Sequence, residues 1–153
     1  MLKENTKAPQ FTLKDKDGNT VSLKDITTEF VVIYFYPRDN TPGCTIEAKQ
    51  FSEALDSFKK LNTTIIGISG GDEKSKTKFC NKHDLKIILL SDTDGKVGEK
   101  YESYGMKKFM GREFLGFKRN TYLLDKKRNI IKVWEKVKPA IHVSEVLEFL
   151  SKM

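Results

Sequence analysis

Two cysteines are the residues of this chain best suited to nucleophilic or redox chemistry, and Cys44 has the more informative surroundings. It ends the segment Tyr-Pro-Arg-Asp-Asn-Thr-Pro-Gly-Cys, which follows an apolar run and precedes a helical pattern. Thr41 is a favourable residue type for a helix N-cap. Pro42 fits the first helical position, because its missing N–H would be unpaired there. The sequence therefore predicts that Cys44 lies in the first turn of a helix.

The first turn of a helix favours the anionic form of a cysteine side chain. Free backbone N–H groups and the positive end of the helix dipole both stabilise an anion at that place. The thiolate is the reactive form of cysteine. A nucleophilic thiolate is therefore one interpretation of Cys44. The other is a small, inert core residue, which is common for free cysteine.

The hydrophobic pattern predicts an α/β fold that positions Cys44 at one edge of a sheet. Phe30–Tyr36 is a continuous β-branched and aromatic run, typical of a strand buried on both faces. Further strands are expected at residues 64–69 and 87–90, and helices at 42–60 and 73–83. This alternation implies right-handed crossovers between parallel strands. Ligands bind outside the carboxyl ends of such strands, where the Cys44 segment follows its strand.

The remaining pattern adds hairpins at both ends of the chain. Apolar residues alternate on either side of Asp17-Gly18-Asn19, and residues 121–124 and 130–134 form a second strand pair. We expect a short helix near residues 97–104, an irregular basic stretch over 105–119, and a last amphipathic helix around Val143–Leu150. The predicted whole is a single domain, residues 1–153, with a thioredoxin-like fold: a mixed central β-sheet flanked by helices, with an N-terminal β-hairpin.

The Cys44 segment resembles the active-site signature of the peroxiredoxins. The pattern Pro-x-x-x-Thr-x-x-Cys is filled by Pro37, Thr41 and Cys44. The longer string, which continues through Glu47 and Ala48, is similar to the bacterioferritin-comigratory, or Q-type, branch of that family. Weaker matches follow in the family's order: Ala8-Pro9-x-Phe11, Leu89-Leu90-Ser91-Asp92 and Arg119-x-Thr121-Tyr122-Leu123.

The resemblance implies a thiol-dependent peroxidase that reduces hydrogen peroxide and organic hydroperoxides. Cys44 would be the peroxidatic cysteine, Thr41 would hold the peroxide through its hydroxyl, and Pro37 would shield the thiolate from water. Arg119 would stabilise the transition state, although by itself it is equally compatible with a surface charge. Glu47 would orient an arginine. No cofactor is expected, because sulfur carries both electrons.

The resemblance also implies a route by which the oxidised Cys44 is resolved. The position at which many relatives carry a resolving cysteine holds Lys49 here, whereas a subset of Q-type relatives carries that cysteine in the helix that holds Cys80. A Cys44–Cys80 disulfide, re-reduced by thioredoxin, is therefore expected. It needs Cα atoms within about 7 Å, so both helices would unwind locally, helped by the polar neighbours Ser75, Thr77 and Asn81. The alternative is a one-cysteine enzyme that uses an external thiol, with Cys80 merely packed.

Composition sets the broader expectations. The chain has 28 basic and 21 acidic residues, a net charge of +7, and 38% hydrophobic residues, as in soluble globular proteins.

Its longest apolar run is far shorter than the ~20 residues of a membrane span, and its N-terminus resembles no targeting signal, so a cytoplasmic location is expected. The basic residues are interleaved with acidic ones and form no recognised nucleic-acid motif, so we expect neither a nucleic-acid nor a membrane partner. The alternative is a basic, non-enzymatic binding module on a thioredoxin-like scaffold. The resemblance implies a monomer.

Overall fold

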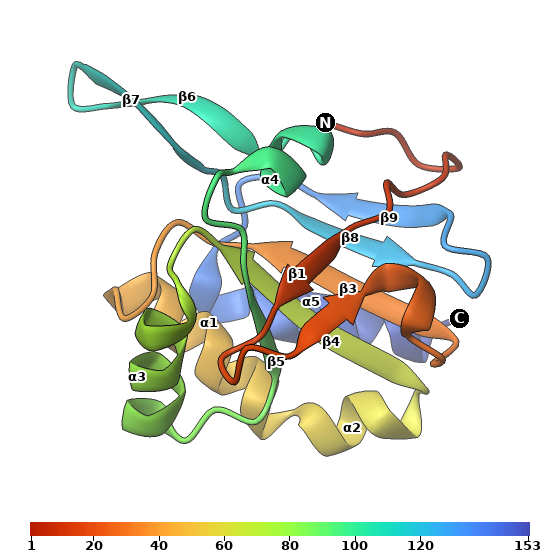
Figure 1. Ribbon diagram of the computed structural model, residues 1–153. Coiled ribbons are helices and arrows are strands. Elements are labelled where there is room, and N and C mark those ends of the chain that lie inside the picture. Colours follow the sequence, from red (N-terminus) through yellow and green to blue (C-terminus); the bar gives the residue numbers. More distant parts are fainter.

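The computed structural model describes residues 1–153 and consists of nine strands, five α-helices and one 3₁₀ turn (Figure 1). The strands are β1 Thr12–Lys14, β2 Thr20–Ser22, β3 Phe30–Phe35, β4 Thr63–Ser69, β5 Ile88–Ser91, β6 Tyr104–Phe109, β7 Arg112–Phe117, β8 Thr121–Leu124 and β9 Ile130–Trp134. The helices are α1 Pro42–Glu53, α2 Leu55–Lys60, α3 Glu73–His83, α4 Lys96–Lys100 and α5 Pro139–Ser151, and the 3₁₀ turn is η1 Leu23–Asp25.

Seven of the strands form one mixed sheet in the order β2-β1-β5-β4-β3-β8-β9. The strands β3, β4 and β5 are parallel, while β8 pairs antiparallel with β3 and β9 pairs antiparallel with β8. The N-terminal hairpin β1–β2 joins the opposite edge through β5. Its turn has Gly18 at φ 80°, and the Asp15 carboxylate accepts hydrogen bonds from the Asp17 and Asn19 N–H groups. The predicted thioredoxin-like, mixed-sheet architecture is confirmed.

The alternating side chains of the central strands divide the core into two halves. In β3, Val32 and Tyr34 face the half covered by α1, α2, α3 and α5, whereas Val31, Ile33 and Phe35 face the half covered by α4 and the N-terminal segment. All five of these side chains are buried, as the apolar run predicts. The first half contains both Cys44 and Cys80. None of the helices has the length and apolar character needed to cross a membrane.

Two expectations about local structure are wrong. The predicted helix over residues 42–60 is two helices, which meet at Ala54 with φ −88° and ψ 4°. The change of direction there lets Phe51 and Phe58 pack in one core, with ring centroids 5.8 Å apart. The stretch 105–119, expected to be irregular, contains the β6–β7 hairpin, whose tip residues Met110 and Gly111 both have positive φ.

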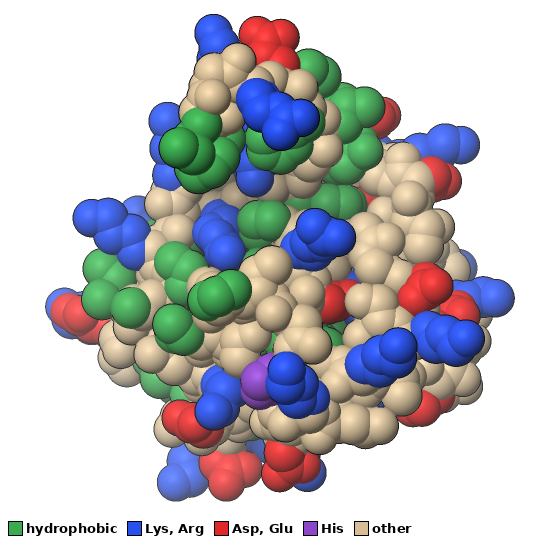
Figure 2. Space-filling view, turned by 90° about the vertical axis from the view of Figure 1, so that its left-hand side faces the viewer, with side chains coloured by type: hydrophobic (Ala, Val, Ile, Leu, Met, Phe, Trp, Pro, Cys, Tyr) green, Lys and Arg blue, Asp and Glu red, His purple; other side chains and the backbone are tan.

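The β6–β7 hairpin projects from the body of the molecule (Figure 1). It forms a separate two-stranded sheet, and several of its large side chains are exposed, including Phe109 and Met110. Hydrophobic side chains lie beside Lys and Arg at this projecting end (Figure 2). Its base is anchored by Tyr104 and Phe117, whose ring centroids lie 4.8 Å apart, with Phe117 buried in the core.

Candidate active site

The start of α1 presents Cys44 much as the local sequence predicts. Thr41 occupies the N-cap position in an extended conformation, Pro42 begins the helix, and Cys44 lies in the first turn. The predicted capping bond is absent, because the Thr41 hydroxyl instead donates to the Arg38 carbonyl at 3.2 Å. The first-turn N–H groups therefore keep their capacity to stabilise an anion.

Arg119 lies directly beside the Cys44 thiol. Its Nη2 donates a hydrogen bond to Cys44 Sγ at 3.2 Å, and no other polar side chain bonds that sulfur. Cys44 is 1% exposed, and the Arg119 side chain is 21% exposed. The surface-charge interpretation of Arg119 is therefore wrong, because its guanidinium is directed inward onto the sulfur.

Sheet topology brings these two distant residues together. The strand β8 runs antiparallel to β3 with Thr121 opposite Tyr34, so Arg119, which precedes β8, runs beside the end of β3. The Arg119 carbonyl accepts from the Val137 N–H at 2.9 Å, which fixes the backbone. A Cβ atom on Gly43 would lie 2.8 Å from Arg119 Nη2, so only glycine allows the guanidinium to approach the helix start so closely.

Glu47 lies on the other side of the same guanidinium. It lies one turn after Cys44 in α1, its side chain is fully buried, and its Oε1 is 3.6 Å from Arg119 Nη1. Neither carboxyl oxygen has a hydrogen-bond partner. Burial raises the pKa of Glu47 from 4.5 to about 8, although the neighbouring Arg119 charge opposes that rise. At neutral pH the protonated Glu47 leaves the Arg119 charge directed at the sulfur.

The substitution Glu47→Gln is expected to change how stability depends on pH. Between pH 4.5 and about 8, the folded protein holds a proton on Glu47 that the unfolded chain has released. The unfolding free energy of the wild type therefore falls as pH rises through this window, by an amount on the order of 5 kcal/mol. Glutamine does not titrate, so the variant should lack this fall. Urea unfolding of both proteins at pH values on either side of the window measures the difference, and parallel curves would contradict it.

Cys80 lies in α3, on the same side of the sheet as Cys44 but in a different helix. It is 4% exposed, and both cysteines are free thiols. Burial raises the pKa of the Cys80 thiol, so it stays protonated while the helix is folded. Two of the polar neighbours expected to loosen the helix, Ser75 and Thr77, instead bond it to other segments. Thr77 Oγ1 donates to the Lys16 carbonyl, and Ser75 Oγ donates to Asp39.

The structure brings together four of the six residues predicted from the sequence. Arg119 contacts both Cys44 and Glu47, and Pro37 lines a surface cavity with Arg119. Thr41 lies at the N-cap three residues before Cys44, with its hydroxyl directed to the preceding loop. Cys80 is apart from this group.

Sequence reasoning missed a set of residues next to the site. Lys107 of β6 is one of several lysines that line the cavity together with Pro37 and Arg119. Asp39 and Lys76 form an ion pair between the loop before α1 and helix α3. The signal for Lys76 was its place one turn before Phe79 and Cys80, on the apolar face of a predicted helix, where a lysine needs a buried partner.

Comparisons with known proteins agree with this geometry. The family described as AhpC/TSA matches residues 5–133. Peroxiredoxin Bcp of Bacillus subtilis is 43% identical over 147 residues, which cover 96% of this chain and 94% of the relative. Among solved structures, a PrxQ mutant of Xylella fastidiosa superimposes with a TM-score of 0.92 at 29% identity and covers 99% of this chain and 97% of its own. Bacterioferritin Comigratory Protein of Xanthomonas campestris gives 0.87 at 33% identity, with 93% and 90% covered.

These matches span nearly the whole chain, including the segments that hold Cys44 and Arg119. The chain therefore belongs to the AhpC/TSA family and is a thiol-dependent peroxidase of the Bcp type of peroxiredoxin.

Proposed function

We propose that this peroxidase reduces hydrogen peroxide and small organic hydroperoxides by direct attack of the Cys44 thiolate on the peroxide. The single observation that carries the proposal is the Arg119 Nη2–Cys44 Sγ contact of 3.2 Å at the first turn of α1. It combines a nucleophile, a fixed positive charge and free backbone donors at one place. Family membership favours this enzyme over the non-enzymatic basic binding module.

In the first step, the sulfur attacks the terminal oxygen of the hydroperoxide. An S–O bond forms, the O–O bond breaks, and the electron pair leaves on hydroxide or alkoxide, which takes a proton from water. Negative charge thus moves from the sulfur to the leaving oxygen, and donors fixed along that line lower the barrier. We assign this stabilisation to Arg119 and to the first-turn N–H groups. Thr41 would hold the peroxide after its hydroxyl turns from the Arg38 carbonyl.

The peroxide would reach the sulfur from a surface cavity of about 560 Å³. Pro37 and Arg119 line it on the side of the active site, and Met106, Lys107 and Lys108 of the projecting hairpin line another wall. Cys44 is 1% exposed, so little water reaches the sulfur, and we assign part of this shielding to Pro37. Such shielding strengthens the attraction between Arg119 and the thiolate.

We assign Cys80 as the resolving cysteine, which attacks the sulfenic acid formed on Cys44. Both thiols lie in the same half of the core, and Cys80 is the only other cysteine. The Xanthomonas campestris protein has been solved with either of two cysteines replaced by serine, and their spacing equals that of Cys44 and Cys80. The folded helix α3 keeps the Cys80 thiol buried, so α3 must unwind before the disulfide forms.

The substitution Cys80→Ser is expected to stop repeated turnover while leaving one stoichiometric turnover. Without the second thiol, the oxidised Cys44 cannot form the internal disulfide that the reductant recognises. Mass spectrometry after one equivalent of peroxide should show loss of two hydrogens in the wild type and gain of one oxygen in Cys80→Ser. Cys80→Ala is the matched control, since it lacks both thiol and hydroxyl. Wild-type protein that gains an oxygen and keeps its second thiol would instead support the one-cysteine route.

The electron donor that fits this scheme is thioredoxin or a similar dithiol, because an internal disulfide is reduced by exchange with a pair of thiols. A cytoplasmic location agrees with two free cysteines, since thiols stay reduced there. We also propose that the enzyme acts as a monomer, because Cys44, Arg119, Glu47 and Cys80 all come from one chain.

A further inference from the structure

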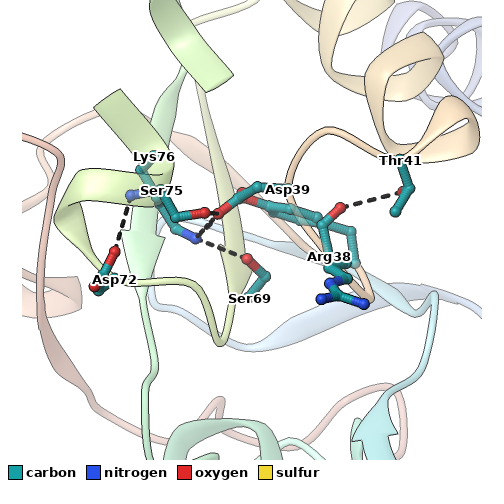
Figure 3. Close-up of polar contacts among 8 residues, drawn as sticks. Arg38, Asp39, Thr41, Ser69, Asp72, Ser75 and Lys76 are labelled. Atoms are coloured by element: carbon teal, nitrogen blue, oxygen red, sulfur yellow. Dashed lines mark hydrogen bonds and ion pairs between the residues drawn. The ribbon is translucent and has the colours of Figure 1, made fainter. Parts of the chain in front are cut away.

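A buried polar network joins the loop before Cys44 to the helix that carries Cys80. The side chains of Lys76 and Asp39 are 0% and 4% exposed, with Nζ and Oδ2 3.2 Å apart. Asp39 also accepts hydrogen bonds from Ser75 Oγ at 2.7 Å and from the Tyr36 hydroxyl at 2.6 Å, while Lys76 Nζ donates to Ser69 Oγ at 2.7 Å. In Figure 3, Ser75 and Lys76 of α3 both point toward Asp39, with Ser69 below them.

The same loop holds α3 at two places. Asp39 binds the first turns of the helix, and Asn40 Oδ1 lies 2.9 Å from Nε2 of His83 at its last residue. A Cβ atom on Gly71 would collide with the Asp39 carboxylate, so glycine at that position is what lets Asp39 approach α3. The loop and the helix therefore form one interlocked unit.

This unit lies between the two segments that the proposed disulfide must bring together. The loop with Asp39 leads directly into α1 and Cys44, whereas Lys76 lies one turn before Cys80 on the same face of α3. Lys76 and Cys80 are both buried and lie one helical turn apart, so we expect a movement that exposes Cys80 to disturb the turn that carries Lys76. Among the polar contacts between the loop and α3, the ion pair is thus the buried one that we expect to open before the second step.

A buried ion pair is suited to a contact that must be specific but also reversible. Removing Lys76 and Asp39 from water is costly, and their mutual attraction offsets that cost only in good geometry. When α3 unwinds, water solvates both charges again, so opening costs less than exposing an apolar contact of equal size. The directed hydrogen bonds to Asp39 define a single closed position.

We propose that Lys76 and Asp39 are positioning residues for the resolution step: their ion pair holds α3 folded while Cys44 reacts with peroxide, and its opening sets the rate at which Cys80 is released. The inference rests on the proposed function of Cys80. In that step the Cys80 sulfur attacks the Cys44 sulfenic sulfur, an S–S bond forms and the S–O bond breaks. The Cys80 proton leaves with the oxygen as water.

The test is the substitution Lys76→Met, which removes the charge and keeps most of the length of the side chain. In stopped-flow experiments, the rate constant for peroxide attack should match the wild type, because Lys76 lies outside the Cys44–Arg119 pair. Disulfide formation should become roughly tenfold faster, because loss of one partner from a buried pair weakens the closed state strongly. At high peroxide concentration the sulfinic acid fraction should fall, since resolution competes with a second oxidation of Cys44.

A control variant separates this effect from general destabilisation. Ile130→Ala removes a fully buried side chain from the other half of the core, so it should lower the unfolding temperature without changing the disulfide rate. Amide exchange over Glu73–His83 should rise selectively in Lys76→Met. Asp39→Asn, which breaks the pair from the other side, should give the same pattern and serves if Lys76→Met does not fold.

Each remaining outcome decides the question. A disulfide rate in Lys76→Met or Asp39→Asn equal to the wild-type rate would overturn the positioning role. An equal acceleration in Ile130→Ala would also overturn it, because global stability would then explain the change. If wild-type protein forms no Cys44–Cys80 disulfide at all, it is the proposed function of Cys80 that fails. Thiol counting on the wild type distinguishes that failure from the others.

Discussion

The substitution Cys44→Ser is expected to abolish peroxide consumption, leaving only the uncatalysed rate. A serine hydroxyl stays protonated near neutral pH, and sulfur is the atom that accepts the oxygen in the proposed first step. Serine can accept the hydrogen bond that Arg119 Nη2 now donates to Cys44 Sγ, so the site should keep its geometry. Following peroxide loss with an excess of thioredoxin and its reductase measures the effect directly.

The matched variant for this experiment is Cys80→Ser, which keeps the nucleophile. It should consume one equivalent of peroxide, whereas Cys44→Ser should consume none. Thermal unfolding of both variants checks that each is folded, because Cys44 and Cys80 are both buried and a hydroxyl in either place has its own cost. Full peroxide turnover by Cys44→Ser would remove the basis for the whole catalytic assignment.

The substitution Arg119→Met is expected to lower the second-order rate constant for peroxide by roughly 10²–10³-fold, as for loss of one fixed donor at a developing charge. Arg119 contacts the sulfur through Nη2 and lies beside Glu47 through Nη1, so both interactions are lost together. Glu47 would then lack the one nearby charge that opposes the rise of its pKa, so it should stay protonated to higher pH.

Arg119→Lys is the conservative comparison, because lysine keeps the charge but offers a single ammonium group where arginine offers a fork. It cannot serve Cys44 and Glu47 at once, so we expect a rate constant between those of the wild type and Arg119→Met. Stopped-flow measurements of peroxide attack over a range of pH give the rate constants of the wild type, Arg119→Met and Arg119→Lys. If Arg119→Met reacts as fast as the wild type, the Arg119–Cys44 contact has no part in the chemistry.

Local residue types were enough to predict the start of the catalytic helix. Helix initiation depends on a few neighbouring residues, and Thr41 and Pro42 place Cys44 in the first turn regardless of the remaining chain. Resemblance to the peroxiredoxins supplied Arg119 and Glu47, which no local rule would have selected. Residue type alone does not reveal that the Thr41 hydroxyl donates to the Arg38 carbonyl and makes no capping bond.

The β6–β7 hairpin shows why a pattern method fails on an exposed element. Hydrophobic alternation reveals a strand when one face is buried, but this hairpin projects from the body with large apolar side chains such as Met106 and Leu115 exposed. Its two strands contact mainly each other. For example, Lys107 lies opposite Phe114 and over its ring. The break at Ala54 was equally hidden, because neither proline nor glycine marks it.

By itself the sequence determined what depends on short stretches of chain: a buried central strand, a hairpin at Asp17-Gly18 and a cysteine at the first turn of a helix. Only the tertiary structure decided which distant groups meet. The β3–β8 pairing directs Arg119 onto Cys44, and the approach of α3 to the preceding loop pairs Lys76 with Asp39. The physical reason is that a buried charge is tolerated only beside its partner. The packing of strands and helices determines which partner that is, and the spacing of residues along the chain does not reveal it.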